Sequence, residues 1–249
     1  RVNGKTDEKL LRRAAEVIRH GGGVLAVYNE DLILRSLTDF GYPLSEARTF
    51  ANDGCWEVQI SGKTCFSYVP FDSLAVLQRV TLKEYSPEEE FADFDELYAK
   101  YLFDLEQQTD KERTAGMERE DASSDGWIWK KSVPCTVVSL FEDGCIKAGR
   151  SYFEGGPRYT VCSPHIGGLP DTANSLYAIK KLIYDDKAVT FRELMNILRN
   201  NWEGAEALRQ YAAAHYVYYG NDNDEVDLLA ARLLKDFSEK CSALNGRCP

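Results

Sequence analysis

The sequence predicts an α/β fold with mainly parallel strands, and three segments carry that prediction. Residues 7–20 place apolar side chains at helical spacing and stop at three glycines. Residues 23–29 (GVLAVYN) form a short unbroken apolar run, which is typical of a strand buried on both faces. A helix, a strand, a loop and a second helix then follow one another within residues 134–184. Alternating helices and strands favour a parallel sheet.

The remaining segments extend this pattern. Helices are expected at residues 30–40, 44–51 and 70–80, an extended segment with a turn at 58–69, solvated helices within 86–125, and a helical tail at 190–237. Within residues 134–184, the strand is expected at 158–162, the loop at 163–171 and the second helix at 172–184. The acidic run at residues 219–227 predicts a helix N-terminus rather than a calcium loop, because the glycine and final glutamate of that loop are missing.

Length, charge and hydropathy narrow the possible functions. With 249 residues, 44% of them hydrophobic, the chain can bury the core of one large domain or two small ones. A net charge of -10 argues against a general nucleic-acid or anionic-membrane surface. The apolar runs fall well short of the roughly 20 residues of a membrane span, and the first residues do not read as a signal peptide. We therefore predict a soluble cytoplasmic protein without nucleic-acid or membrane partners.

The residues that bind metals and cofactors are not grouped in the sequence. The seven cysteines are scattered without CxxC spacing, and the three histidines stand alone, so no metal centre is expected. Neither GxGxxG nor GxxxxGK[ST] occurs, which leaves dinucleotide and P-loop sites without support. We expect no cofactor bound in this chain and mostly reduced thiols, with Cys65 and Cys162 serving as packing residues.

Residues 52–60 (NDGCWEVQI) hold the best candidate for chemistry. Asn52, Asp53 and Gly54 form a turn signature, and Gly54 removes a side chain just before the thiol of Cys55. On an extended strand or finger, Cys55 and Glu57 would point to the same side and could address one substrate. The alternative is that Cys55 is a small buried hydrophobe and that Glu57 lies on the surface.

Four segments of this chain resemble the glycyl radical enzymes, in the dehydratase and lyase branch of the pyruvate formate-lyase-like family. The segment NDGCWEVQISGKT at residues 52–64 resembles the Gly-Cys-x-Glu finger of that family. Residues 8–37 resemble the helix and strand that lead into the finger. Residues 143–187 and 219–227 are similar to later barrel segments, and all four segments occur in the family's order.

The resemblance implies a particular fold and a radical. Residues 1–249 would form part of a ten-stranded α/β barrel, with the cysteine finger at about residues 51–60 inside and helices outside. A protein-based glycyl radical, installed by a radical S-adenosylmethionine activating enzyme, would take a hydrogen atom from Cys55. The full-length protein would be a homodimer that acts on a small-molecule substrate.

The resemblance also implies roles for individual residues. The thiyl radical on Cys55 would abstract hydrogen from the substrate, and Glu57 would act as general base or acid in an elimination. Trp56, Asn52, Asp53 and His165 are the candidates for lining the substrate cavity. Because Trp56 replaces the second cysteine of the formate-lyases, their adjacent-cysteine chemistry is disfavoured.

Two features depart from the family pattern. The Arg-Val-[Ser/Thr]-Gly-Tyr motif of the radical site is absent from the C-terminal region, and Arg1-Val2-Asn3-Gly4 lies on the wrong side of the finger. The long N-terminal half of the family is missing as well. We therefore expect an excerpt of a larger enzyme that is inactive alone and exposes apolar surface where the absent parts would pack.

Two other readings of the sequence stay open. Cys55 could be the ionised nucleophile of a hydrolase or acyltransferase, paired with His165. The chain could also be a non-catalytic α/β module whose cysteines only pack. A histidine within hydrogen-bond reach of Cys55 would favour the first of these readings.

Overall fold

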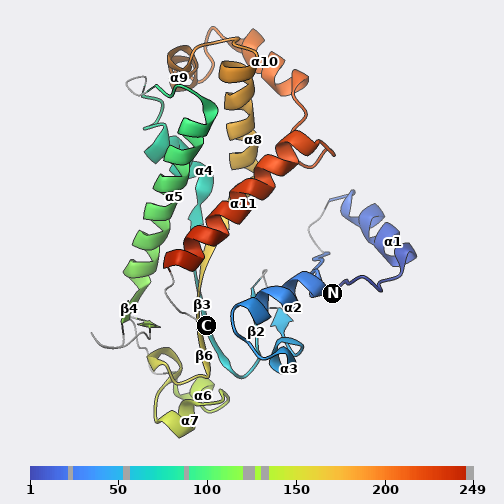
Figure 1. Ribbon diagram of the computed structural model, residues 1–249, viewed down its shortest axis with the longest axis vertical. Coiled ribbons are helices and arrows are strands. Elements are labelled where there is room, and N and C mark those ends of the chain that lie inside the picture. The colour runs from blue at the N-terminus through green and yellow to red at the C-terminus, as the bar shows by residue number, and fades with distance from the viewer. Residues whose placement is uncertain (22–24, 53–56, 87–89, 120–126, 130–134, 245–249) are drawn as a thin grey trace. The chain divides into compact units, whose positions relative to one another are not determined.

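The computed structural model describes residues 1–21, 25–52, 57–86, 90–119, 127–129 and 135–244. The chain divides into two compact units, which Figure 1 shows in ribbon form. The first unit holds residues 1–66 and 131–161, and the second unit holds residues 67–130 and 162–248. Each unit is built from separate stretches of sequence. The boundary between the two units therefore does not coincide with a single linker that could be found in the sequence.

Short helices and a small hairpin make up the first unit. Its elements are α1 (Glu8–Ile18), α2 (Glu30–Asp39), α3 (Leu44–Ala47), β1 (Ala51–Asn52), β2 (Val58–Gln59), α6 (Thr136–Ser139), α7 (Cys145–Ala148) and the 3-10 turn η2 (Tyr152–Glu154). The side chain of Asp7 accepts a hydrogen bond from the backbone N–H of Lys9 at the start of α1, and Asn29 accepts one from Leu32 at the start of α2. These caps satisfy N–H groups that have no partner within the helix, and so they fix where both helices begin.

The core of the first unit is small and lies around the hairpin. Its buried side chains come from α2, α3 and the segments next to β1, β2 and β6, and they are Leu37, Tyr42, Ala47, Phe50, Ile60 and Tyr159. Phe50 is 1% exposed and Ile60 is 2% exposed. These two residues flank the hairpin, so its base is held by apolar burial on both sides.

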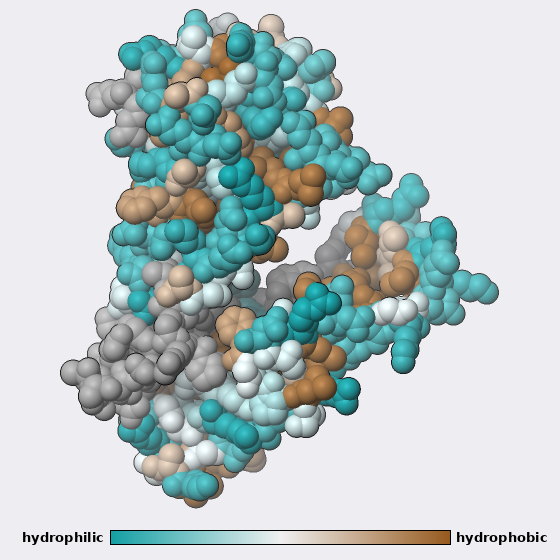
Figure 2. Space-filling view, viewed as in Figure 1, coloured by the Kyte–Doolittle hydropathy of each residue, from teal (hydrophilic) through white to brown (hydrophobic). Residues whose placement is uncertain are grey.

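Helix α1 buries none of its residues within the described structure. Its apolar face carries Leu10, Leu11, Val17 and Ile18, which are 60%, 40%, 39% and 48% exposed. Figure 2 shows this hydrophobic surface over α1. Helices in soluble proteins normally bury such a face against another element. The apolar face of α1 is therefore open to contact with other polypeptide.

The second unit is dominated by helices. Its elements are α4 (Ser73–Ala75), the π-helix η1 (Val76–Thr81), α5 (Phe94–Gly116), β4 (Met117–Arg119), β5 (Trp127–Trp129), α8 (Leu169–Ile179), the π-helix η3 (Lys180–Asp185), α9 (Phe191–Arg199), α10 (Glu206–His215) and α11 (Asp224–Leu244). Two long strands, β3 (Thr64–Asp72) and β6 (Tyr159–Gly167), begin in the first unit and end in the second.

One hydrophobic core holds the second unit together. Helix α11 packs against α5 and α8, and α5 packs against η1. The side chains at the centre are fully buried and come from these helices and from α9, and they include Leu97, Tyr101, Leu105, Leu176, Met195 and Leu233. Asn223 caps α11 by accepting a hydrogen bond from the N–H of Glu225, which confirms the helix N-terminus predicted within residues 219–227.

The long strands β3 and β6 pair with each other, and their contacts show that they are parallel. Near their beginnings, the N–H of Tyr159 donates to the carbonyl of Lys63. Near their ends, the hydroxyl of Ser73 donates to the carbonyl of Gly167. Among the described residues, the other two pairs behave differently: β1 is antiparallel to β2, and β4 is antiparallel to β5. The expectation of mainly parallel strands therefore holds for β3 and β6 only.

Three sequence predictions need correction. Residues 25–28 of the expected strand at 23–29 form no strand, and Leu25 and Val27 are each 42% exposed. A strand buried on both faces needs neighbouring strands, and the described residues supply only an isolated bridge between Val2 and Asn29. Helix α5, expected to be solvated, buries one face in the core. The expected loop at 163–171 continues strand β6 to Gly167 because that segment pairs with β3.

Candidate functional site

The cysteine segment folds as a hairpin, which we call the finger hairpin (residues 51–59). Ala51 pairs with Gln59 and Asn52 pairs with Val58, in antiparallel register. The chain therefore reverses direction between Asn52 and Val58, as the turn signature in the sequence predicts. The predicted site residues Asp53, Cys55 and Trp56 lie outside the described residues. Their roles, and the pairing of Cys55 with His165 in the hydrolase reading, stay predictions.

The base of the finger hairpin is fixed by a buried threonine. The hydroxyl of Thr64 accepts a hydrogen bond from the N–H of Ile60 at 3.1 Å and lies at the same distance from the Ile60 carbonyl, to which it donates. Thr64 is only 3% exposed. The N–H and the carbonyl of Ile60, the residue after β2, are thus both hydrogen-bonded without water. These bonds fix the backbone at the base of the finger hairpin.

Glu57 sits at the C-terminal end of the reversal and is 8% exposed. Carboxylate side chains are seldom buried this far unless they have contacts within the protein. A carboxylate with so little contact with water can exchange a proton with a bound molecule more directly than with solvent. The alternative that places Glu57 on the surface is wrong, whereas its catalytic role stays a prediction.

Asn52 lies opposite Val58 and is half-buried. Its side-chain nitrogen is shielded from water and has no hydrogen-bond partner among the described residues. A buried donor without a partner is uncommon in proteins and calls for an explanation. An acceptor oxygen on a bound molecule would provide one, in line with the predicted substrate-lining role of Asn52.

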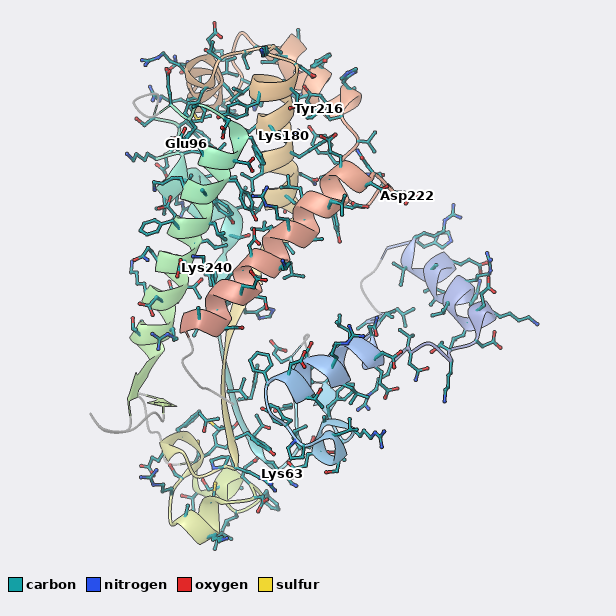
Figure 3. All side chains as sticks on the ribbon, in the orientation of Figure 1. Lys63, Glu96, Lys180, Tyr216, Asp222 and Lys240 are labelled. Carbon is teal, nitrogen blue, oxygen red and sulfur yellow. The ribbon has the colours of Figure 1, made fainter. Side chains whose placement is uncertain are left out.

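A charged cluster under the finger hairpin went unpredicted. The carboxylate of Glu46 accepts a hydrogen bond from the hydroxyl of Tyr159 at 2.6 Å, and it forms ion pairs with Arg158 at 2.8 Å and Lys63 at 3.3 Å. Figure 3 labels Lys63 in this region. The hydrogen bond from Tyr159 is the largest effect holding the pKa of Glu46 below its ordinary value, and the two cations act in the same direction. No local sequence motif could reveal this charged cluster, because Glu46 and Tyr159 are 113 residues apart.

Cys65 follows the finger hairpin and is completely buried. Burial raises the pKa of its thiol to about 12. The hydroxyl of Tyr152 accepts a hydrogen bond from the N–H of Phe66 at 2.9 Å, next to this thiol. A thiol that stays protonated is a poor nucleophile and a poor metal ligand. The complete burial of the Cys65 side chain confirms the prediction that it is a packing residue. The side chain of Cys162 lies outside the description.

His165 lies in the second unit, on strand β6. It lines a cavity of about 450 Å³ at the carboxyl ends of β3 and β6. The other lining residues are Pro70, Phe71, Asp72, Leu74, Gly167, Gly168 and Asp171. Ligands commonly bind at the carboxyl ends of parallel strands, so this cavity suits a substrate-binding role for His165. The finger hairpin belongs to the first unit and this cavity to the second.

The described part of the chain contains no recognisable metal-binding site. No group of three or more histidine, cysteine, aspartate or glutamate side chains is arranged there to hold a metal ion. Cys65, Cys135 and Cys145 are free thiols. In the same residues, no helix is both long enough and apolar enough to cross a membrane.

The pyruvate formate lyase-like family model matches residues 1–246 of this chain. The chain belongs to that family. The match takes in the finger hairpin, the cavity that contains His165 and all of the helical tail. The glycyl radical enzyme resemblance drawn from the sequence is thereby confirmed.

Dehydratases are prominent among the similar proteins. The chain is 28% identical over 239 residues to trans-4-hydroxy-L-proline dehydratase of Clostridioides difficile, covering 91% of this chain and 30% of that protein. A crystal structure of hydroxyproline dehydratase from the same organism with trans-4-hydroxy-L-proline bound has a TM-score of 0.78 and 26% identity, covering 96% of this chain and 31% of that one. The glycerol-bound B12-independent glycerol dehydratase from Clostridium butyricum has a TM-score of 0.76 and 27% identity, with the same coverage.

These comparisons support an α/β fold, and they also give the scale of the match. The chain spans just under a third of the length of the relatives that it matches. The structural match to hydroxyproline dehydratase extends over 96% of this chain. What the complete proteins do applies to this chain only as a proposal.

Proposed function

We propose that this chain forms part of a glycyl radical dehydratase or lyase, in which Cys55 handles a hydrogen atom and Glu57 handles a proton. The observation that supports this most is the finger hairpin. Its strands bracket residues 53–57, so Cys55 falls within the reversal and the buried Glu57 falls at its end. Membership of the pyruvate formate lyase-like family and the dehydratases among the relatives support the same reaction class.

The chemistry assigned to the finger hairpin balances within one turnover. When present, a glycyl radical would supply the oxidising equivalent by taking the hydrogen atom of the Cys55 thiol. Cys55 then takes a hydrogen atom from a substrate carbon, which leaves a carbon radical and restores the thiol. Glu57 accepts the proton of the hydroxyl on that carbon while a neighbouring group leaves. The product radical then takes a hydrogen atom from Cys55, and the resulting thiyl radical would take one back from the glycine, which restores the glycyl radical. The leaving group departs with the proton that Glu57 accepted.

The surroundings of Glu57 fit this role. Thr64, Phe50 and Ile60 fix the base of the finger hairpin, so the carboxylate keeps its position while the substrate changes. The low exposure of Glu57 keeps competing water away from the proton transfer. We assign to the Asn52 amide a hydrogen bond to an oxygen of the substrate, since its nitrogen is buried and lacks a partner among the described residues.

The substrate class follows from the same groups. A small molecule with a hydroxyl next to the abstracted hydrogen suits one proton acceptor, Glu57, and one donor, Asn52. Both trans-4-hydroxy-L-proline and glycerol, which appear in the names of similar proteins, are small hydroxylated molecules. We propose that Asp53, Trp56 and His165 also line the substrate cavity, and that Trp56 restricts its size.

The complete assembly is part of the proposal. Residues 1–249 would contribute one part of a ten-stranded barrel that encloses the finger hairpin, and the apolar face of α1 would be covered by the rest of that barrel. A radical S-adenosylmethionine activating enzyme would generate the glycyl radical. The complete enzyme would be a homodimer.

Replacing the thiol tests the proposal. The complete gene product, activated without oxygen, should lose turnover in Cys55→Ser, because a hydroxyl does not yield its hydrogen atom to the glycyl radical. Its electron paramagnetic resonance signal should still form, since activation acts on a different residue. Cys65→Ser is the matched control and should keep turnover. Turnover by Cys55→Ser at the wild-type rate would refute the proposed role of Cys55.

A further inference from the structure

A second cavity lies in the second unit, and residues of η1, α8, η3 and α9 form most of its lining. It has a volume of about 150 Å³. Most of its lining is aliphatic or aromatic, and the lining residues are Leu74, Leu77, Gln78, Leu82, Tyr85, Ser175, Ala178, Ile179, Leu182, Leu194, Leu198 and Trp202. His165 and the finger hairpin do not line it. Leu74 lines both this cavity and the cavity of His165, and the other lining residues of the two cavities differ.

The backbone around this cavity is irregular on two sides. The π-helix η1 contributes Leu77 and Gln78 to the lining, and the π-helix η3 contributes Leu182. In the turn that closes η1, the N–H of Leu82 donates to the carbonyl of Leu77 at 2.8 Å, a span of five residues. Helices of this type are rare and are often found at functional sites. Two of them border one cavity here.

The two aromatic residues of the lining, Tyr85 and Trp202, both have a left-handed backbone conformation. Tyr85 has φ of 72° and Trp202 has φ of 64°, and their neighbours Lys83, Glu84 and Asn201 are also in the left-handed region. Non-glycine residues in this region carry a steric cost, and clusters of them are typical of binding sites. The guanidinium of Arg199 donates to the carbonyl of Tyr85 at 2.6 Å, which joins the two turns.

The walls combine buried aliphatic side chains with few polar groups. Leu77, Leu182 and Leu194 are each no more than 2% exposed. The amide of Gln78 donates to the hydroxyl of Tyr85 at 3.0 Å, so these two polar groups satisfy each other. A cavity of this polarity offers water few hydrogen bonds. It favours an apolar occupant instead.

We infer that this cavity is a binding site for one small apolar ring, of about the size of benzene. An enclosed apolar cavity of roughly 150 Å³ accommodates benzene or xenon. This cavity has about that volume and is partly open to solvent, which gives such a molecule a way in. Apolar walls lined by two aromatic rings are typical of small-molecule pockets. The strained turns at Tyr85 and Trp202 explain why the space is kept open, since relaxing them would move both rings of the lining.

Toluene and benzene are the probes for this inference, used with the 249-residue chain. Ligand-observed nuclear magnetic resonance should show saturable binding, and the fluorescence of Trp202 should change over the same concentration range. Ala178→Leu places three additional carbon atoms into the cavity and should weaken binding at least about tenfold. Ala99→Leu makes the same change on an exposed position of α5 and should leave binding unchanged.

Ser175→Leu fills the cavity from another position of α8 and gives a second measurement if Ala178→Leu fails to fold. Circular dichroism and urea unfolding identify the variants that are folded. Loss of binding in a folded filling variant, with binding kept in Ala99→Leu, supports the site. Absence of saturable binding to the wild-type chain, or equal binding by a folded filling variant, overturns it.

Discussion

The hydroxyl groups of Ser73 and Thr172 lie 2.8 Å apart, although the two residues are 99 positions apart in the sequence. Both side chains are completely buried. Ser73 donates to the carbonyl of Gly167 at 2.7 Å, so Thr172 is the donor of the bond between the two hydroxyls. The Thr172 hydroxyl also lies 2.8 Å from the carbonyl of Gly168, which accepts a hydrogen bond from the N–H of Thr172. These bonds join the end of β3 to the end of β6. They hold together the two turns that line the cavity of His165.

Ser73→Ala tests how much this pair contributes to stability. The substitution leaves the carbonyl of Gly167 buried without its hydroxyl donor, and an unsatisfied buried polar group costs about 1–3 kcal/mol. We expect the free energy of unfolding to fall by about that amount, measured by urea unfolding of the 249-residue chain.

A double-mutant cycle separates the pair from the general cost of each substitution. Ser73→Ala combined with Thr172→Val should be less destabilising than the sum of the single changes, because the two hydroxyls share one bond. Ser242→Ala removes a hydroxyl from an exposed position and should change stability by less than about 0.5 kcal/mol. Additive effects within the cycle would show that the two hydroxyls are not coupled.

Glu46 should make the first unit sensitive to acid. Its pKa in the folded protein lies below the ordinary value of 4.5, first because of the hydrogen bond from Tyr159. A depressed pKa stabilises the folded state above pH 4.5, and this contribution is lost as the pH falls through the lower folded value. Tyr159→Phe should therefore lose less stability than the wild type between about pH 7 and about pH 3.5. Urea unfolding at both values measures the difference.

Glu46→Gln is the control for the acid effect. It cannot ionise, so the contribution of this site to the pH dependence should vanish. Arg158 and Lys63 still contact Glu46 in Tyr159→Phe, and part of the effect should remain in that variant. A wild-type pH dependence in Glu46→Gln would mean that other carboxyl groups account for the acid sensitivity.

Cys65 should resist alkylation while the chain is folded. With a pKa of about 12, its thiolate fraction near neutral pH is roughly a thousandfold below that of an ordinary cysteine. Cys135 is half-buried and serves as the internal comparison. Timed iodoacetamide labelling followed by peptide mass spectrometry should show Cys65 reacting at least about a hundredfold more slowly. In concentrated urea the two rates should converge, whereas a persistent difference would point to local sequence rather than burial.

A substitution on the exposed apolar face of α1 should leave the stability of the chain almost unchanged. Leu10 is 60% exposed and α1 buries none of its described residues, so Leu10→Glu should change the free energy of unfolding by less than about 0.5 kcal/mol. It should also reduce self-association, measured by sedimentation, because it interrupts an exposed apolar face. Phe50→Ala, in the core of the first unit, should cost about 3–5 kcal/mol. Unfolding caused by Leu10→Glu would show that this face is covered in solution.

The features that the sequence predicted well depend on neighbouring residues. Helix α1 lies within the predicted range, and the N-terminus of α11 is where the acidic run places it. The strands of the finger hairpin pair on either side of the turn signature that the sequence shows after Ala51, so the chain reverses where that signature predicts. Caps, turns and helical periodicity are local properties, and they are therefore visible in a single sequence.

The missed features depend on distant residues. The strand expected at 23–29 would need neighbouring strands, and its described part stays exposed. The bonds between Ser73 and Thr172, and between Glu46 and Tyr159, span 99 and 113 positions. Serine, threonine and glutamate usually lie on the surface, so their types gave no signal of burial. The π-helices η1 and η3 likewise resemble ordinary helices in their apolar spacing.

Glu57→Gln separates proton transfer from hydrogen-atom transfer in the proposed reaction. Glutamine keeps the shape of the buried side chain but cannot accept the substrate's hydroxyl proton. In the complete, activated enzyme we expect kcat to fall by about 10²–10⁴ with little change in KM. Hydrogen abstraction by Cys55 should continue, so in D₂O the unreacted substrate should still gain deuterium at carbon through the exchanged thiol. Glu57→Asp, which keeps the carboxylate, should recover part of the turnover. Wild-type kcat in Glu57→Gln would remove Glu57 from the mechanism, and loss of both turnover and exchange would assign it to positioning Cys55 instead.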